Sequence, residues 1–267
     1  MKGKKFIAPG AWFCMVYPAD WNEFEDGEGS FLFYNPDKWT GNFRISAFRG
    51  NASYGRTCVE EELRSNRGAK SVIVGKMLCA YSVETFDEEG VRYENHQWVG
   101  AMDDLAFEIS FAVKQGESIA EAQEVIASVE PRRPDVKYPA EVIPVRLSEI
   151  MEIDEAFDWV QSSVKEELKK DFRSEEEDVP NMQKLVESGK LNRKKREAWI
   201  ALGITLCVIL ADEVEGMEWR TLIDGNREAP VLVSADGEVM IDPMKLVWSK
   251  VKAGEEVNLV EIYKGML

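Results

Sequence analysis

The chain contains one histidine, His96, so any chemistry that needs an imidazole must use that residue. If residues 87–90 form a four-residue turn between two paired strands, His96 lies opposite Tyr81 and Cys79 lies opposite Trp98. Cys79 and His96 then stand diagonally on one face, about 7 to 8 Å apart at the backbone. A thiol–imidazole pair for nucleophilic catalysis is therefore geometrically possible. A histidine on a partly exposed strand face is the simpler interpretation, because no acidic orienting group or oxyanion-hole motif stands beside it.

Carboxylates are abundant, and two of them at a suitable separation could perform general acid–base catalysis. They gather at predicted turns and on helix faces, where solvated charge is expected: residues 60–62, 87–89, 103–104 and 175–178. The acidic loops near residues 25 and 224 lack the ligand spacing of an EF-hand. Gly27 and Gly29 lack the following helix and lysine of a phosphate cradle. We therefore assign no catalytic residue, no cofactor and no metal site from the sequence.

The cysteines and the apolar segments are those expected of a cytoplasmic protein. The four cysteines lie far apart and none belongs to a CxxC pair, which suggests neither a zinc clip nor a redox motif. Pro9 and Gly10 interrupt the N-terminus before the apolar region of a signal peptide can form. The apolar run 198–211 has 14 residues, against the roughly 20 that a helix needs to cross a bilayer. We expect it to be a buried helix.

The formal net charge is −16, from 49 Asp and Glu against 33 Lys and Arg. Nucleic-acid binding relies on Lys and Arg that neutralise phosphates, and an anionic membrane surface would repel such a chain. We therefore expect neither nucleic acid nor membrane as a partner. A basic protein surface or a cationic ligand is the expected charged partner, and solubility alone is the alternative explanation of the charge.

One tryptophan and one acidic loop are the candidate contacts for a protein partner. Trp39 lies in the polar segment NPDKWTGN, and an exposed tryptophan on a loop is a plausible interface anchor. The alternative is simple packing of its indole on the sheet. The acidic loop carries Glu25, Asp26 and Glu28 between two apolar runs.

The first half of the chain carries the spacing of β-strands. The clearest is 105–113, where five large apolar residues alternate with small or polar ones, as in a sheet with one buried face. Further strands are predicted at 12–17, 31–34, 43–48, 71–74, 79–86 and 91–99. Short connections imply mainly antiparallel pairing. Capping boxes at Thr57 with Glu60 and at Ser118 with Glu121 predict two helices. The expected class is α+β, an antiparallel sheet backed by helices.

The proline-rich segment 131–144, PRRPDVKYPAEVIP, predicts an extended linker. It separates a domain at residues 1–134 from a second domain at residues 145–267. Apolar residues spaced by three and four predict one long helix over 148–172. Asp236 and Gly237 stand between two strand-like runs, which predicts a hairpin. The second domain is therefore expected to be smaller and helix-rich, with long helices and a hairpin.

The order of elements in the first half, with YPADW closing the first strand and FLFYNP and NFRISAFR after it, resembles the PsbP/Mog-type α/β sandwich. The resemblance covers residues 1–130. It implies a structural corner, in which Pro18 fixes the strand end and Trp21 covers the sheet edge. It also implies a binding or assembly module rather than a catalyst. With AWIALGITLCVIL, MEWRTLID and DPMKLVWSK in its second half, the whole chain resembles a two-domain bacterial family of unknown function.

These patterns favour a non-catalytic module that binds another protein, as an adaptor or as an inhibitor of the immunity type that neutralises a basic toxin. One alternative is a hydrolase-type enzyme that uses carboxylates or the Cys79/His96 pair. Another is a small-ligand carrier with a cavity between sheet and helices. The acidic charge, the lack of converging reactive groups and the resemblance favour the first hypothesis, although fold analogy alone is a weak argument for function.

Overall fold

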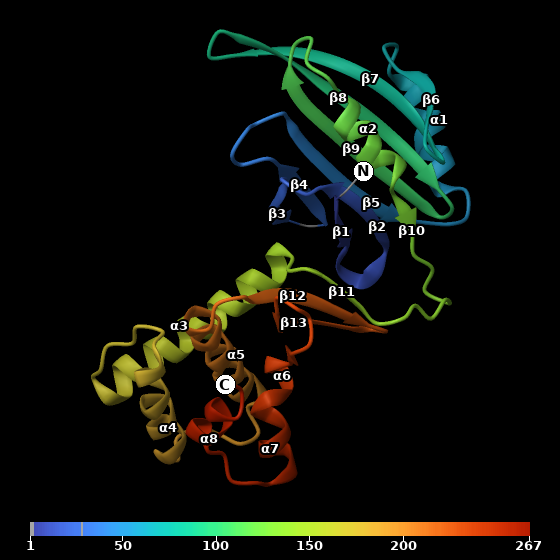
Figure 1. The fold of residues 1–267 in the computed structure, drawn as a ribbon. Helices are drawn as coiled ribbons and strands as arrows, with labels where there is room; N and C mark the ends of the chain where they lie inside the picture. Colours follow the sequence, from blue (N-terminus) through green and yellow to red (C-terminus); the bar gives the residue numbers. More distant parts are fainter. Residues whose placement is uncertain (1–2, 28) are drawn as a thin grey trace. The chain divides into compact units, whose positions relative to one another are not determined.

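The computed structural model describes residues 3–27 and 29–267, and the chain divides into two compact units (Figure 1). The units are Met1–Tyr138 and Pro139–Leu267. The division falls inside the proline-rich segment 131–144, but both ends of that segment are paired strands. Glu130–Pro131 pairs with a strand of the first unit, and Glu141–Pro144 pairs with a strand of the second.

The first unit contains β1 (Gly3–Ile7), β2 (Phe13–Pro18), β3 (Asn22–Gly27), β4 (Ser30–Tyr34), β5 (Asn42–Arg49), α1 (Tyr54–Ser65), β6 (Lys70–Val74), β7 (Met77–Glu88), β8 (Val91–Met102), β9 (Leu105–Lys114), α2 (Ala120–Ala127) and β10 (Glu130–Pro131). The second unit contains β11 (Glu141–Pro144), α3 (Leu147–Leu168), α4 (Val179–Glu187), α5 (Arg196–Glu213), β12 (Met217–Asp224), β13 (Arg227–Ser234), β14 (Met240–Ile241), α6 (Pro243–Leu246), α7 (Trp248–Ala253) and α8 (Leu259–Lys264). The expected α+β class is confirmed.

The first unit is built on a seven-stranded antiparallel sheet in the order β3-β4-β5-β9-β8-β7-β6. A separate three-stranded sheet has the order β1-β2-β10. The sequence analysis did not predict β1 and β3. The reason is local: β1 begins with the polar run Gly3–Lys5, and β3 is mostly acidic and amide residues, so neither shows an apolar strand pattern.

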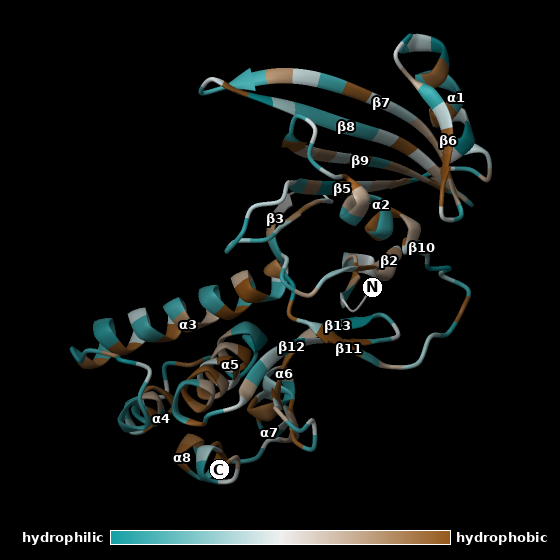
Figure 2. Ribbon diagram, turned by 45° about the horizontal axis from the view of Figure 1, so that its top comes forward, coloured by the Kyte–Doolittle hydropathy of each residue, from teal (hydrophilic) through white to brown (hydrophobic). Residues whose placement is uncertain are grey.

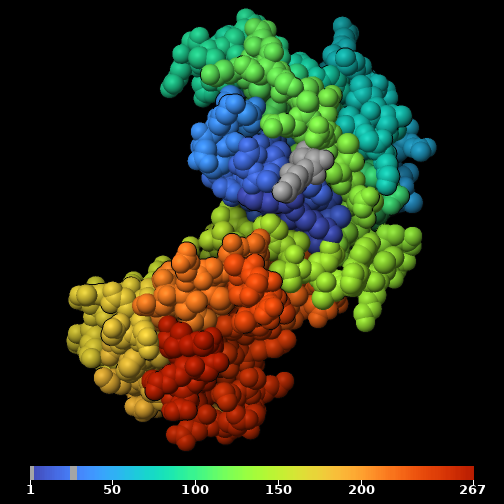
Figure 3. Space-filling model, in the orientation of Figure 1, coloured from blue at the N-terminus to red at the C-terminus, as the bar shows by residue number. Residues whose placement is uncertain are grey.

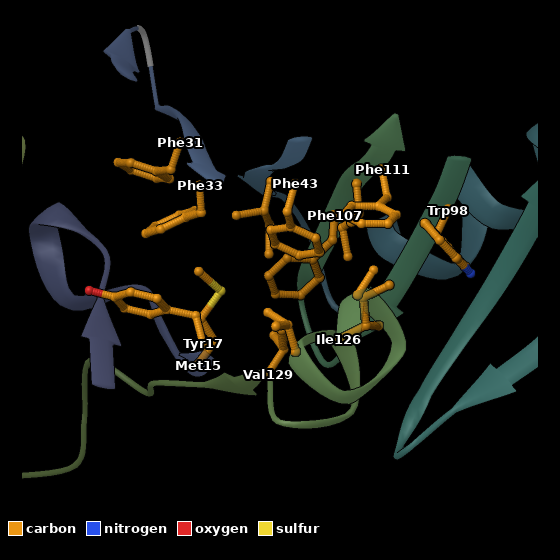
Figure 4. Packing of buried hydrophobic residues seen from close by; sticks show 14 of the residues in the cluster. Met15, Tyr17, Phe31, Phe33, Phe43, Trp98, Phe107, Phe111, Ile126 and Val129 are labelled. Atoms are coloured by element: carbon orange, nitrogen blue, oxygen red, sulfur yellow. The ribbon is translucent and has the colours of Figure 1, made fainter. Parts of the chain in front are cut away.

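The core of the first unit lies between these two sheets. Aromatic rings of β4, β5 and β9 face Met15 and Tyr17 of β2, while Ile126 and Val129 close the core beside them (Figure 4). The ring centroids of Tyr17 and Phe33 are 4.9 Å apart. Trp21, which follows the Pro18 corner, is fully buried, so the Pro/Trp segment is a structural bend.

Helix α1 packs against β7, β8 and β9 on the opposite side of the seven-stranded sheet from this core. Gly55 permits the close approach, because a Cβ atom there would lie 2.2 Å from the carbonyl oxygen of Leu105. The predicted cap of this helix was wrong. Thr57 lies inside the helix, and its hydroxyl donates to the carbonyl oxygen of Ser53 at 3.1 Å. The predicted capping box of α2 is not formed either, because the N-cap residue is Ile119 and Ser118 accepts from the amide of Ala120 at 3.2 Å.

The second unit packs helices on a four-stranded antiparallel sheet in the order β11-β12-β13-β14. Helix α5 has buried residues on every face, as its uniformly apolar sequence predicted. Helix α3 is amphipathic and shows alternating hydrophilic and hydrophobic bands (Figure 2). It ends at Leu168, four residues before the predicted end, because Lys169 adopts a left-handed conformation. The C-terminal residues, dark red in Figure 3, lie among the helices of this unit.

A buried ion-pair cluster joins the start of α3 to the sheet of the second unit. Nε of Arg146 donates to Glu149 at 2.8 Å, and its Nη2 donates to Glu228 at 2.8 Å. The hydroxyl of Thr221 donates to Glu149 at 3.1 Å. Arg146 is 2% exposed, so these carboxylates compensate a cation that has lost its water.

Candidate functional site

The face of the seven-stranded sheet that points away from the core is largely polar. Its side chains form rows across β5, β9, β8 and β7. The first row is Arg44, Ser110, Gln97 and Ser82; the second is Ser46, Glu108, Val99 and Ala80; the third is Asn42, Ala112, Asn95 and Glu84. We call the surface formed by these three rows the open face.

A groove of about 340 Å³ lies on the open face. The first and second rows line it, and Glu62 of α1 completes it on one side. The groove therefore depends on the close approach of α1 to β9, because that approach brings Glu62 over the sheet. Its size is within the range of pockets that hold small ligands or single side chains of a partner.

The open face and the wall of its groove carry both positive and negative side chains, and carboxylates outnumber cations. The guanidinium of Arg44 donates to the hydroxyl of Ser30 at 3.2 Å. The carboxylate of Glu62 accepts from the side-chain amide of Asn66 at 2.8 Å, and Gln97 donates to Glu84 at 3.4 Å. These hydrogen bonds hold the side chains in defined orientations, so the surface presents donors and acceptors without large rearrangement.

Three aromatic side chains stand at the end of the open face that lies away from α1. Phe86 and Tyr93 are cross-strand partners with ring centroids 5.3 Å apart, and Trp39 meets Tyr93 edge-on at 6.0 Å. Trp39 is 38% exposed and Phe86 is 40% exposed. The indole N–H of Trp39 donates to Asn42 at 2.7 Å, which fixes the ring. We call Trp39, Phe86 and Tyr93 the aromatic group.

The structure separates Trp39 from the acidic loop that the sequence analysis grouped with it. The backbone of Glu25 pairs with Leu32, and that of Asp26 pairs with Phe31, on the β3–β4 hairpin. The side chains of Glu25 and Asp26, and the whole of Glu28, lie outside the described part of the structure. Their predicted role in contacts stays a prediction.

The Cys79/His96 pair, which the sequence left as an alternative, is not formed. The β7–β8 turn has two residues rather than four, because Glu88 still pairs with Val91. His96 therefore lies opposite Val83, and Cys79 lies opposite Gly100, four residues along the strand. Four residues of strand span about 13 Å, beyond the reach of a thiol–imidazole hydrogen bond. Burial raises the pKa of Cys79 to about 12, so the nucleophilic thiolate is disfavoured.

His96 instead contacts Tyr81, on the core side of the sheet. The Tyr81 hydroxyl lies 2.7 Å from Nδ1 of His96, and Nε2 of His96 lies 3.5 Å from Glu94. Burial raises the pKa of Tyr81, so its hydroxyl stays protonated. The carboxylate of Glu94 favours the tautomer whose proton lies on Nε2, and in that tautomer Nδ1 accepts a hydrogen bond from the Tyr81 hydroxyl. His96 is 7% exposed, and its imidazole lies beside Trp98. His96 is therefore a buried, hydrogen-bonded residue of the core, and the interpretation favoured from the sequence, a histidine on a partly exposed strand face, was wrong.

Within residues 3–27 and 29–267, no three His, Cys, Asp or Glu side chains converge to form a metal site. Over the same residues, none of the helices combines the length and apolar character needed to cross a bilayer.

The sequence analysis missed most of the open face, although part of its pattern was visible. Glu108 and Ser110 occupy the polar positions of the alternation in 105–113, which placed them opposite the core. Predicting the neighbouring rows requires knowledge of the register between strands. Predicting the wall of the groove requires knowledge of where α1 packs. Phe86 and Tyr93 become neighbours only in the observed two-residue register.

The fold defines an α+β protein with antiparallel sheets in both units and long helices in the second. The chain belongs to the family described as domain of unknown function DUF3805, which matches residues 1–154. Residues 178–263 match a second family, described as domain of unknown function DUF3806. The expected resemblance to a two-domain family of unknown function is confirmed.

Solved structures include one very similar protein. A crystal structure from Bacteroides thetaiotaomicron VPI-5482 is 60% identical, with a TM-score of 0.96, over 99% of this chain and 98% of that one. LpqN of Mycobacterium tuberculosis, involved in cell envelope biogenesis, is 11% identical, with a TM-score of 0.33, over 50% of this chain and 87% of that one. Cyanobacterial PsbP from Synechocystis sp. PCC 6803 is 13% identical, with a TM-score of 0.23, over 49% and 94%. No curated protein matches the chain.

Proposed function

We propose that this protein is a non-catalytic binding module, an adaptor or inhibitor that holds a basic protein partner on the open face of its first unit. One observation carries the proposal. Trp39 and Phe86 of the aromatic group stand exposed at the end of a polar sheet surface that also holds a groove. Exposed aromatic anchors beside hydrogen-bonding groups are the usual composition of protein-binding surfaces.

The charge supports a basic partner. Glu84 and Glu108 of the open face, with Glu62 of α1 at the side of its groove, outnumber Arg44, and the whole chain carries a net charge of −16. Complementary charge raises association rates and selects among partners. The separation of Cys79 from His96 removes the thiol version of the hydrolase alternative.

The proposal is tested by capture with the immobilised full chain from a lysate of the cells that produce it. The wild type is compared with Trp39→Ala/Phe86→Ala, which removes two members of the aromatic group. Val136→Ala is the matched control, because Val136 is a 43% exposed apolar residue outside the open face. We expect a basic protein that the wild type and Val136→Ala retain and the double variant loses. The captured protein should also elute as salt rises, because salt screens charge attraction.

Equal recovery of every captured protein by the double variant and the wild type would refute the open face as the binding surface. Retention of only acidic proteins would refute the expected charge of the partner. Thermal unfolding of all three proteins shows whether a lost interaction reflects the surface or a lost fold.

A further inference from the structure

The second unit has a separate concave surface between α3 and α5. It encloses about 520 Å³. Glu152, Glu155 and Trp159 line it from α3, and Glu197, Ala201 and Ile204 are among the residues that line it from α5. We call this surface the α3–α5 groove. It lies wholly within the second unit and shares no residue with the open face.

The length of the α3–α5 groove matches two turns of helix. Glu152 and Trp159 are seven residues apart on α3, and Glu197 and Ile204 are seven residues apart on α5. Seven residues of α-helix rise about 10.5 Å. An amphipathic helix that binds in a groove uses anchors at positions i, i+3, i+4 and i+7, which span the same length.

The floor of the groove is apolar. Ala198 and Ala201 are small, which leaves depth between the two helices, and Ile204 closes the floor. Trp159 is 39% exposed and presents its ring at the side. The aliphatic stem of a lysine or arginine can lie on such a ring while its charged end reaches a carboxylate.

The rim of the groove is acidic. Glu152, Glu155 and Glu197 line it together with one cation, Lys195, and the neighbouring Arg196 also acts on Glu152. None of the three carboxylates has a hydrogen-bond or ion-pair partner among residues 3–27 and 29–267. Partial burial, together with the negative charges of Glu149 and Glu155, raises the pKa of Glu152. The second unit has 27 Asp and Glu against 17 Lys and Arg, so an approaching cation meets an attractive field.

We propose that the α3–α5 groove binds an amphipathic helix of a partner that carries Lys or Arg beside its apolar stripe. The groove length selects a helix of at least two turns, the apolar floor accepts its leucine-type anchors, and the acidic rim selects its charge. This inference is independent of the open face of the first unit.

The test uses a defined probe, a fluorescently labelled helical peptide with Leu at positions i, i+3, i+4 and i+7 and with Lys and Ala elsewhere. Its fluorescence anisotropy is followed during titration with the full chain. A peptide of the same composition in scrambled order removes the apolar stripe. A third peptide, with Glu in place of Lys, reverses the charge. We expect binding of the first peptide and at least about tenfold weaker binding of the other two.

Two variants test whether the peptide binds in the α3–α5 groove. Ala198→Trp fills the floor at a half-buried position, and we expect it to abolish binding. Glu152→Gln/Glu155→Gln removes two rim charges, and we expect about fivefold weaker binding together with a smaller salt dependence. The matched control Asp154→Asn/Glu166→Gln removes two exposed charges of α3 outside the groove and should bind like the wild type.

Several results would overturn the inference. They are failure of the first peptide to bind, equal binding by Ala198→Trp when its thermal unfolding is unchanged, and equal affinity for the Glu peptide. A wild-type dimer that Ala198→Trp converts to a monomer would show that a second copy of the chain fills the groove. Binding that Trp39→Ala/Phe86→Ala abolishes would place the peptide on the open face, so the two proposals can fail separately.

Discussion

Tyr81 and His96 are diagonal neighbours on β7 and β8, and the tyrosine hydroxyl lies 2.7 Å from Nδ1 of the imidazole. The two rings are nearly parallel, with an angle of 18° between their planes. Glu94 faces Nε2 at 3.5 Å and favours the neutral tautomer that carries its proton there, in which Nδ1 accepts from the Tyr81 hydroxyl. The only histidine of the chain is thereby held neutral in the core side of the sheet.

This arrangement predicts a pH dependence of stability. Burial lowers the pKa of His96 and outweighs the opposing effect of Glu94. The unfolded chain therefore binds a proton more readily than the folded one, so the stability contributed by neutral His96 is complete above its unfolded pKa of about 6.5 and is lost as pH falls toward its folded pKa. We expect the melting temperature of wild type to fall more between pH 7.5 and 5.5 than that of His96→Gln. Parallel curves for the two proteins would contradict the prediction.

Glu94 provides a second variant for the same measurement. Glu94 is the group that raises the pKa of His96, so Glu94→Gln should lower that pKa further. The loss of stability should then continue to lower pH than in the wild type. A double variant, His96→Gln/Glu94→Gln, should show no such extension.

The buried Arg146 predicts a large stability effect in the second unit. Glu149→Gln removes one of the carboxylates that pair with the buried cation, so we expect a loss of about 3 kcal/mol, the lower part of the range for breaking a buried pair. Glu218→Gln is the control, because its pair with Arg220 is exposed and is expected to contribute about 1 kcal/mol or less. Urea unfolding followed by circular dichroism measures both. Equal losses of unfolding free energy in the two variants would show that the burial of Arg146 does not determine the size of the loss.

Glu152 of helix α3 predicts a pH dependence of stability opposite to that of His96. Although Glu152 is an exposed residue, partial desolvation and the charges of Glu149 and Glu155 raise its pKa and outweigh the opposing charge of Arg196, so its ionised form is disfavoured in the folded chain. Stability is therefore lost as pH rises through the folded pKa of Glu152, and Glu152→Gln should raise the melting temperature at pH 7. The gain should disappear at pH values below the unfolded pKa of about 4.3. Glu166→Gln, an exposed change on the same helix, serves as control, and a lower melting temperature for Glu152→Gln at pH 7 would contradict the argument.

The strand pattern was readable from the sequence where one face is buried and the other is polar. The alternation over 105–113 predicted both β9 and the faces of its side chains, because the period of two is set by the backbone. The apolar run of α5 likewise predicted a buried helix. In these segments local pattern and tertiary packing agree, so the local signal was sufficient.

The register of β7 and β8 was not readable in the same way. Asp87 and Glu88 look like turn residues, but they continue the strand beyond the core, where acidic side chains reach solvent. The turn is Glu89 and Gly90, with φ values of 51° and 79°, which a two-residue hairpin turn requires. A turn shorter by two residues moved His96 from Tyr81 to Val83. The groove on the open face depends on this register and on the packing of α1, which no local pattern contains.

The carboxylates that line the groove on the open face allow a test between the binding module and the remaining hydrolase alternative. Glu62 and Glu108 line one groove, so an acid–base mechanism would use them, whereas a binding surface would lose only part of its charge when they are neutralised. We expect Glu62→Gln/Glu108→Gln to fold normally and to weaken capture of the basic partner about fivefold. We also expect neither this variant nor the wild type to hydrolyse nitrophenyl esters or glycosides above the buffer rate. Turnover by the wild type that the double variant abolishes would make the groove an active site, because neutral amides keep the shape of the surface but cannot transfer a proton.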